Sequence, residues 1–186
     1  MIAECMIFLA SFGVINQPTQ ELLQEYQQCS DIIPSSMSRY SSIYVDNFDE
    51  ENLYTAMRIG WCESRGKQNA YRKSADDSGL MQFIPSTWDW IAEKFDAPMF
   101  NSQVLTYGGV PLKFLPEQDF YVVEGFAYET IQFNPYYNIW MASKLAEDTY
   151  KKKNGETYTT WRDWNSSKFC WGDKKVFERK WRNEGF

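Results

Sequence analysis

Three segments of the chain have apolar residues at the spacing of an amphipathic helix. The first follows Asp49, a suitable N-cap, and Glu50 and Glu51 suit the positive first turn of a helix. Gly66 is expected to end this helix, which places Glu63 in its last turn. The face of small and apolar residues consists of Leu53, Met57, Gly60, Trp61 and Ser64.

The second helix is expected to begin at Ser86, with Asp89 as its capping partner, and to end near residues 96–98. Beyond it, residues 98–133 contain a turn rich in glycine and proline at 107–111. We expect loops and short helical pieces in this stretch. The apolar positions of the second helix are Trp88, Ile91, Ala92 and Phe95.

The third helix has the strongest signals in the chain. Asn134 is a suitable cap, Pro135 suits the first helical position, and the lysines at 151–153 suit the negative last turn before Asn154-Gly155. Its apolar positions are Ile139, Ala142, Leu145, Ala146 and Thr149. Because strand signals are sparse elsewhere, the fold class is predicted to be mainly α.

The N-terminal part of the chain differs from the rest. An apolar run at residues 6–15 is too short to span a bilayer, and no basic residue precedes it as in a signal peptide. The residues that follow are polar, with one short helix expected at 21–29. We therefore predict an N-terminal arm or linker at 1–47 and a single domain at 48–186, with no membrane span. An uncleaved arm is favoured over a secretory signal.

Composition narrows the possible chemistry. The chain has no His, which removes Ser-His-Asp and Cys-His catalysis and the usual zinc sites. A net charge of -6 argues against a nucleic-acid partner, although residues 151–186 are basic and suit either an anionic polymer or plain solvation. The four Cys show no CxxC spacing, so we expect no metal and no cofactor, while disulfides are permitted. Carboxylate chemistry remains.

Glu63 has the setting of a proton donor. A glutamate with the ordinary pKa of about 4.3 is ionised near neutral pH. The negative end of the helix disfavours an anion at Glu63, and apolar neighbours such as Trp61 and Met81 would desolvate it, so both effects raise its pKa. A carboxylic acid that keeps its proton can protonate a glycosidic oxygen. By position alone, however, a glutamate at a helix end is usually a solvated surface residue.

Three motifs occur in order around and after this glutamate. They are Glu63-Ser64, then Gly79-Leu80-Met81-Gln82 followed by Pro85 and a helix, then Asn134-Pro135-Tyr136-Tyr137-Asn138-Ile139. The combination closely resembles the lytic transglycosylase family of the lysozyme-like superfamily, whose signatures are an ES dipeptide, a GLMQ segment and an NPxxNI-type helix. The resemblance implies a lysozyme-like α+β domain with little strand at 48–186.

The resemblance also implies a reaction. The family cleaves the bond between N-acetylmuramic acid and N-acetylglucosamine in peptidoglycan without using water. Glu63 would be the single catalytic residue, first as the acid for the glycosidic oxygen and then as the base for the muramic acid 6-hydroxyl, which closes on C1 to give a 1,6-anhydro end. The substrate's N-acetyl group would stabilise the cation. Asp76 and Asp77 are expected to be merely solvated or capping.

Substrate contacts are expected from the matched motifs. Gln82 is the expected polar contact to the sugar or to Glu63, and Met81 with Ile84 would shape the cleft wall, although Met81 suits a core equally well. Ser74 lies roughly where the family has a Ser near the acid. The substrate-binding residues that we predict are Ser64, Ser74, Met81, Gln82, Ile84, Tyr137, Trp164 and Asn165.

The C-terminal part departs from the family pattern. Many members have an AYNAG-like segment whose Tyr faces the catalytic Glu, and this chain has residues 161–172 in its place, similar to wall-cleaving domains with a W…W…C ending. Trp164 or Asn165 is the expected replacement for the Tyr. Cys170 has an apparent mate in Cys62, and we expect a Cys62–Cys170 disulfide in preference to two buried thiols.

Two alternatives remain open. A muramidase would use the same fold with water as the attacking group, and a non-catalytic structural or wall-binding virion protein would keep the fold for adhesion or assembly. The expected partner is the glycan strand of peptidoglycan, at the cell wall in the periplasm or outside the cell. An enzyme of this kind without a convincing signal peptide fits a phage lysin or a virion-associated protein, with residues 1–47 docking on other virion subunits.

Overall fold

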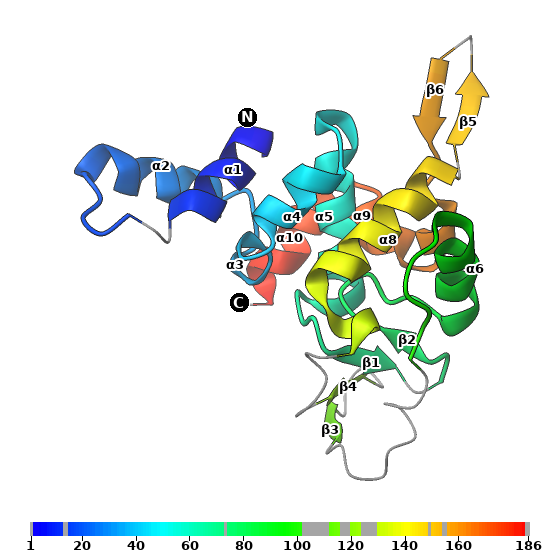
Figure 1. Cartoon of the computed structure of the whole chain (residues 1–186). Helices are drawn as coiled ribbons and strands as arrows, with labels where there is room; N and C mark the ends of the chain where they lie inside the picture. The colour runs from blue at the N-terminus through cyan, green and yellow to red at the C-terminus, as the bar shows by residue number, and fades with distance from the viewer. Residues whose placement is uncertain are drawn as a thin grey trace. The chain divides into compact units, whose positions relative to one another are not determined.

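The computed structural model describes residues 2–12, 15–72, 74–101, 112–115, 120–123, 130–148, 150–153 and 156–184 (Figure 1). The chain forms two compact units. Unit 1 consists of Met1–Arg65 together with Asp163–Phe186, and unit 2 consists of Gly66–Arg162. The described part is mainly helical with short antiparallel strands, which confirms the predicted fold class. None of the helices described is long and apolar enough to cross a membrane.

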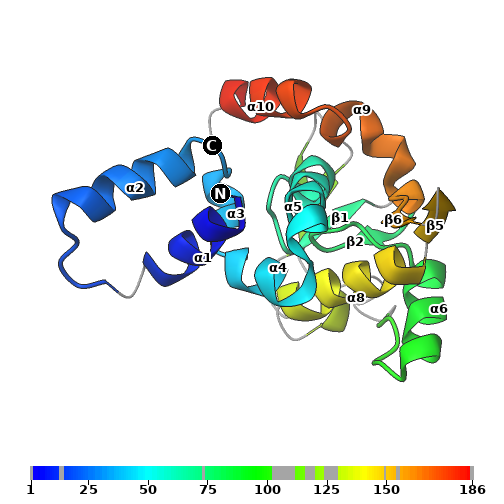
Figure 2. The ribbon, with the colours of Figure 1, turned by 90° about the horizontal axis from the view of Figure 1, so that it is seen from above.

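Unit 1 begins with four helices in the segment expected to be an arm. The expected short helix at 21–29 is confirmed as α2, whose first turn is capped by Thr19 through a bond from the Leu22 backbone N–H. A disulfide between Cys5 and Cys29 joins α1 to α2, and the two helices lie side by side (Figures 1 and 2). The four helices are α1 (Ile2–Phe12), α2 (Gln20–Ser30), α3 (Ser35–Ser38) and α4 (Ser41–Asn47).

Apolar burial explains why this polar-looking segment is ordered. Met6, Ile33, Met37 and Tyr44 are fully buried, one in each of the helices α1, α3 and α4 and one in the turn after α2. Burying a side chain of this size contributes on the order of 1.5–3 kcal/mol. Helices α3 and α4 have only four and seven residues, too few to produce a helical period over a long window, so the sequence pattern predicts only a linker there.

Helix α5 (Glu50–Ser64) runs as predicted. The Asp49 carboxylate accepts from the Asn52 backbone N–H at 2.9 Å, which satisfies one of the free donors at the helix start. The helix ends because Arg65 and Gly66 both have left-handed backbone conformations, with φ of 57° and 73°. Glu63 therefore lies in the last turn, as expected from the sequence.

The C-terminal helices of unit 1 pack on the apolar face of α5. Trp61 and Tyr54 of α5 both make edge-to-face contacts with the buried Phe177, with ring centroids 5.4 Å and 6.3 Å apart. The Asp173 side chain caps the helix that carries Phe177. The elements are the 3-10 helix η3 (Arg162–Ser167), α9 (Lys168–Trp171) and α10 (Lys174–Asn183), with α9 and α10 consecutive in Figure 2.

Unit 2 contains an antiparallel sheet with strand order β2-β1-β4-β3. In its register, Tyr71 pairs with Ser78 on one side and with Tyr121 on the other. The strands are β1 (Ala70–Arg72), β2 (Asp77–Ser78), β3 (Leu112–Leu115) and β4 (Phe120–Val123). The expectation of only loops and short helical pieces at 98–133 is wrong, although η2 (Ile131–Phe133) is such a piece. The turn expected at 107–111 lies outside the described residues.

The two long helices of unit 2 are α6 (Pro85–Phe95) and α8 (Pro135–Asp148), which pack on each other (Figure 1). The predicted start of α6 is wrong. Its N-cap is Ile84, which makes no side-chain cap, and Pro85 takes the first helical position. Asp89 instead accepts a bond from the Phe100 backbone N–H at 2.8 Å, so it holds the segment after the helix.

Helix α8 begins as predicted, since the Asn134 side chain accepts from the Tyr136 backbone N–H at 3.0 Å. Its predicted end is wrong. The helix stops at Asp148, and the residues expected as its last turn form strand β5 (Tyr150–Lys153), paired with β6 (Glu156–Thr159). The intervening Asn-Gly at 154–155 is the strongest short hairpin signal in a sequence, and the prediction of a helix stop there is wrong.

Candidate active site

Glu63 is partly exposed on the last turn of α5 and bonded to a serine from η3. The Ser167 hydroxyl lies 2.5 Å from Oε1 of Glu63, a short contact of the kind expected between a hydroxyl and a carboxylate. The two residues are 104 positions apart in the sequence. The structure thus places a neutral hydroxyl, not a second carboxylate, on this oxygen of Glu63.

Ser167 is itself held by its neighbours in η3 and α9. The Trp171 indole N–H is within 3.0 Å of both the Ser167 hydroxyl oxygen and the Trp164 carbonyl oxygen. The Ser167 hydroxyl is also 3.1 Å from that same carbonyl. Both tryptophan side chains are buried, with 4% and 6% of their surface exposed. The serine therefore sits on a small rigid platform.

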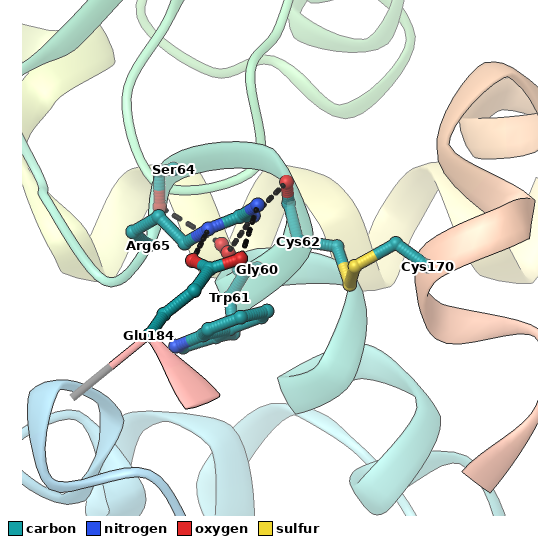
Figure 3. A network of polar contacts seen from close by, with 7 residues as sticks. All are labelled: Gly60, Trp61, Cys62, Ser64, Arg65, Cys170 and Glu184. Atoms are coloured by element: carbon teal, nitrogen blue, oxygen red, sulfur yellow. Dashed lines mark hydrogen bonds and ion pairs between the residues drawn. A yellow bond between two sulfur atoms is a disulfide. The ribbon is translucent and has the colours of Figure 1, made fainter. Parts of the chain in front are cut away.

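A disulfide joins the two segments that carry Glu63 and Ser167. Cys62 of α5 is bonded to Cys170 of α9, with their Cα atoms 6.0 Å apart, and Figure 3 shows the bond beside the end of α5. This pairing confirms the expected disulfide. Since Cys62 precedes Glu63 directly and Cys170 follows Ser167 by three residues, the bond limits how far the two side chains can separate.

Arg65 caps the C-terminal end of α5 (Figure 3). Its guanidinium donates to the carbonyl oxygens of Trp61 at 3.2 Å and Cys62 at 2.8 Å. The Trp61 carbonyl also accepts the Arg65 backbone N–H at 2.7 Å, so one residue caps the helix end with both its backbone and its side chain. Glu184 pairs with the same guanidinium through two bonds of 2.6 Å and 3.3 Å. The guanidinium also lies 4.2 Å from the centre of the Trp61 ring.

In unit 2, Asn138 ties the second motif to the third. Its Oδ1 accepts from the Met81 backbone N–H at 2.7 Å, and its Nδ2 donates to the carbonyl oxygens of Ser78 at 3.2 Å and Gln132 at 2.8 Å. Asn138 is fully buried on α8. The GLMQ segment is therefore held by one amide that uses most of its bonding capacity.

The GLMQ segment has an unusual backbone. Gly79 has φ of 80° and Gln82 has φ of 50°, the second being uncommon for a residue with a side chain. The Gln82 amide donates to the carbonyl oxygens of Ala70 at 3.1 Å and Gly79 at 2.8 Å. Its Oε1 is buried and has no hydrogen-bond partner among the described residues.

The other predicted substrate-binding residues differ in exposure. Ser64 is buried and bonds back to the Gly60 carbonyl at 2.8 Å inside α5, and Met81 is fully buried. Ile84 is exposed, as is Ser74 in the turn between β1 and β2, and Tyr137 on α8 is partly exposed. In η3, Trp164 is buried and Asn165 is exposed. The side chain bonded to Glu63 from this segment is Ser167, not either of these two.

Asp76 and Asp77, the acids nearest in sequence after Glu63, have contacts within unit 2. Asp76 accepts from the Tyr71 hydroxyl at 2.6 Å. Asp77 is only 2% exposed and pairs with Arg72, so it is a buried ion-pair partner, and the prediction of a merely solvated or capping residue is wrong for it. No group of three or more Cys, Asp and Glu side chains within the described ranges is arranged to hold a metal ion.

The sequence-based prediction missed Ser167 and Asn138. Asn138 had a usable signal, because it is part of the NPxxNI motif, but only its helix-starting residues were interpreted. Ser167 had almost no signal in the sequence. It is the second of two consecutive serines in a segment without helical period, and its contact with Glu63 depends on a disulfide and a tryptophan platform.

A mainly helical chain with a small antiparallel sheet after the helix that carries Glu63 is consistent with the lysozyme-like superfamily that the motifs resemble. Residues 46–105 match the family model described as transglycosylase SLT domain, which confirms the resemblance inferred from the motifs. This segment belongs to the lytic transglycosylase (SLT) family of that superfamily, and it contains Glu63 and the GLMQ segment. Comparisons with curated proteins and with solved structures return no match.

Proposed function

We propose that the protein is a lytic transglycosylase that cleaves the β-1,4 bond between N-acetylmuramic acid and N-acetylglucosamine in peptidoglycan. The family match supports a peptidoglycan-cleaving function at the level of the family. The observation that carries the proposal is the position of Glu63 within that match, at the end of α5 and bonded to Ser167. The precise bond and product are our inference.

The reaction would need only one carboxyl group. Glu63 gives its proton to the glycosidic oxygen while the C1–O bond breaks, and the N-acetyl group of the muramic acid stabilises the charge at C1. Glu63 then takes the proton of the 6-hydroxyl as O6 bonds to C1, which gives a 1,6-anhydro end and returns Glu63 to its starting state. No water is consumed. The engagement of Asp76 and Asp77 with Tyr71 and Arg72 supports a single-carboxylate mechanism.

We propose that residues predicted from the motifs in both units contact the substrate or support such contacts. Gln82 is buried, and its amide donates to the Ala70 and Gly79 carbonyl oxygens, which suits a role in shaping the backbone behind the sugar contacts. Ile84, Ser74, Tyr137 and Asn165 have exposed or partly exposed side chains that suit direct contact. The buried residues Ser64, Met81 and Trp164 suit a supporting role behind such contacts.

A digest of purified peptidoglycan by the wild type and by Glu63→Gln tests the function. Mass spectrometry of the soluble products should show 1,6-anhydro ends for the wild type and no products above background for Glu63→Gln, because the amide cannot donate or accept the transferred proton. Reducing ends in place of anhydro ends would identify a muramidase. Equal inactivity of both proteins on every wall tested would favour a non-catalytic wall-binding protein.

We also propose that the protein acts at the cell wall, in the periplasm or outside the cell, and is delivered as a phage lysin or a virion-associated protein. The exposed apolar side chains Ile7, Leu23 and Tyr26 on α1 and α2 support a docking role for residues 1–47 on other virion subunits. Detection of the protein in purified particles, at a constant ratio to a capsid subunit, tests this location. Its absence from particles would leave the lysin role.

A further inference from the structure

The Ser167 hydroxyl has one hydrogen and two candidate acceptors. The Glu63 oxygen lies at 2.5 Å and the Trp164 carbonyl oxygen at 3.1 Å. The Trp171 indole N–H can only donate, and it is shared between the Ser167 oxygen and the Trp164 carbonyl oxygen, both at 3.0 Å. Toward Ser167 it occupies a lone pair, so the hydroxyl hydrogen points at an acceptor. The shorter and charge-assisted contact is the one to Glu63.

A donor on Oε1 has two consequences for a carboxyl group that acts as acid and then as base. In the acid form, the oxygen that already accepts a strong bond is the poorer position for the acid's own proton, which is therefore placed on Oε2. In the base form, the same donor stabilises the negative charge that appears when the proton leaves. A hydroxyl suits both forms because it is neutral, whereas a lysine would hold Glu63 ionised from the start.

We propose that Ser167 is a positioning residue that orients the Glu63 carboxyl group and stabilises its ionised form during proton transfer to the leaving oxygen. Trp171 orients Ser167 in turn, and the Cys62–Cys170 disulfide holds the two segments together. The proposal rests on the proposed function, since it assigns a role within that reaction. It adds a residue outside the matched range of the family model, which ends at residue 105.

Ser166 provides a matched control for the test. It is the neighbouring serine of η3 and is exposed. Ser166→Ala therefore removes a serine hydroxyl from the same helix without changing Ser167, Trp164 or Trp171. On soluble, uncrosslinked glycan strands, we expect Ser167→Ala to lower kcat by about tenfold to a hundredfold with KM unchanged, as for loss of one charge-assisted bond. Ser167→Thr, which keeps the hydroxyl, should recover most of kcat, and Ser166→Ala should match the wild type.

Two results would overturn the proposal. One is a wild-type kcat for Ser167→Ala. The other is a folded Ser167→Thr, with an unchanged Tm and both disulfides intact by mass, that is as slow as Ser167→Ala. Trp171→Phe tests the same hydroxyl from its other side, and we expect a smaller loss of about twofold to tenfold because the serine remains but is no longer oriented.

A spectroscopic measurement separates this proposal from the proposed function. In protein labelled with 13C at the glutamate carboxyl carbon, the Glu63 signal is assigned by its loss in Glu63→Gln. We expect that signal to shift in Ser167→Ala, to return toward its position in Ser167→Thr and to stay in place in Ser166→Ala. An unmoved signal in Ser167→Ala would refute the contact even in a protein inactive on every wall, whereas a shift with no activity would leave only the function in doubt.

Discussion

Gly79 lies against Asn138 so closely that no other residue fits at this position. A Cβ atom on Gly79 would collide with the Asn138 side chain and with the Gln132 carbonyl oxygen, and the glycine φ of 80° is one that other residues rarely adopt. The same Asn138 bonds the Met81 backbone. The glycine and the asparagine of two separate motifs therefore form one structural unit.

We expect Gly79→Ala to destabilise the protein by about 2–5 kcal/mol, which combines backbone strain with overpacking. Urea unfolding at neutral pH measures this change. Asn138→Asp is the companion variant, since it keeps the volume but removes the donor to the Ser78 and Gln132 carbonyls. A Gly79→Ala protein with wild-type stability would show that the GLMQ segment is not held against α8.

The two disulfides should contribute unequally to stability. Cys62–Cys170 has a sequence separation of 108 and Cys5–Cys29 one of 24. In the chain-entropy account, the longer loop is worth about 1.3 kcal/mol more, at about 4.8 against about 3.5 kcal/mol. We expect the Cys62→Ser/Cys170→Ser double variant to lose more stability than Cys5→Ser/Cys29→Ser in denaturant unfolding. If the Cys5→Ser/Cys29→Ser variant lost more stability, packing around the disulfides, and not loop closure, would be the main source of their stabilisation.

Helix capping offers a second matched pair. Asp49 accepts from the Asn52 backbone N–H, whereas the cap position of α6 is Ile84 and Ser86 caps nothing. Asp49→Ala should therefore cost about 1 kcal/mol, and Ser86→Ala should change stability by less than about 0.5 kcal/mol. Thermal unfolding of both variants under one condition measures the difference. A loss of about 1 kcal/mol of stability in Ser86→Ala would instead support Ser86 as the N-cap of α6, as expected from the sequence.

We expect the protein to lose stability at alkaline pH because the Tyr54 side chain is buried. Burial, followed by the nearby Glu178 charge, raises the pKa of Tyr54 from 10.0 to about 12. A raised pKa means that the folded state holds the proton more tightly, so this stability is complete below pH 10 and is lost as pH rises toward 12.

The Tyr54→Phe variant isolates this effect from other alkaline titrations. Burial also raises the pKa of Tyr44, which remains in both proteins. We expect the free energy of unfolding of Tyr54→Phe to fall less steeply than that of the wild type between pH 10 and 12, with similar values at pH 7. Parallel pH dependences for the two proteins would contradict the burial of the Tyr54 hydroxyl.

Local signals in the sequence were sufficient for the elements that carry the motifs. Asp49 and Gly66 bound α5, and Asn134 with Pro135 begin α8, because caps and proline act on the first or last turn only. The same reasoning failed where a local pattern had two meanings. Asn154-Gly155 after three lysines suits a helix end and a hairpin turn alike, and only the pairing of β5 with β6 decides between them.

The sequence by itself determined the resemblance to the family and the helix that presents Glu63, the acid that we propose. Each motif is a continuous stretch of sequence: Glu63 with its neighbour, the GLMQ segment, and the third motif. Such motifs can be identified from neighbouring residues alone. Only the tertiary structure decided which residues these motifs contact. Ser167 reaches Glu63 across 104 residues, and Asn138 reaches Met81 across 57. Such contacts arise when separate elements pack together, and a hydrogen bond between distant residues leaves no periodic trace in either segment.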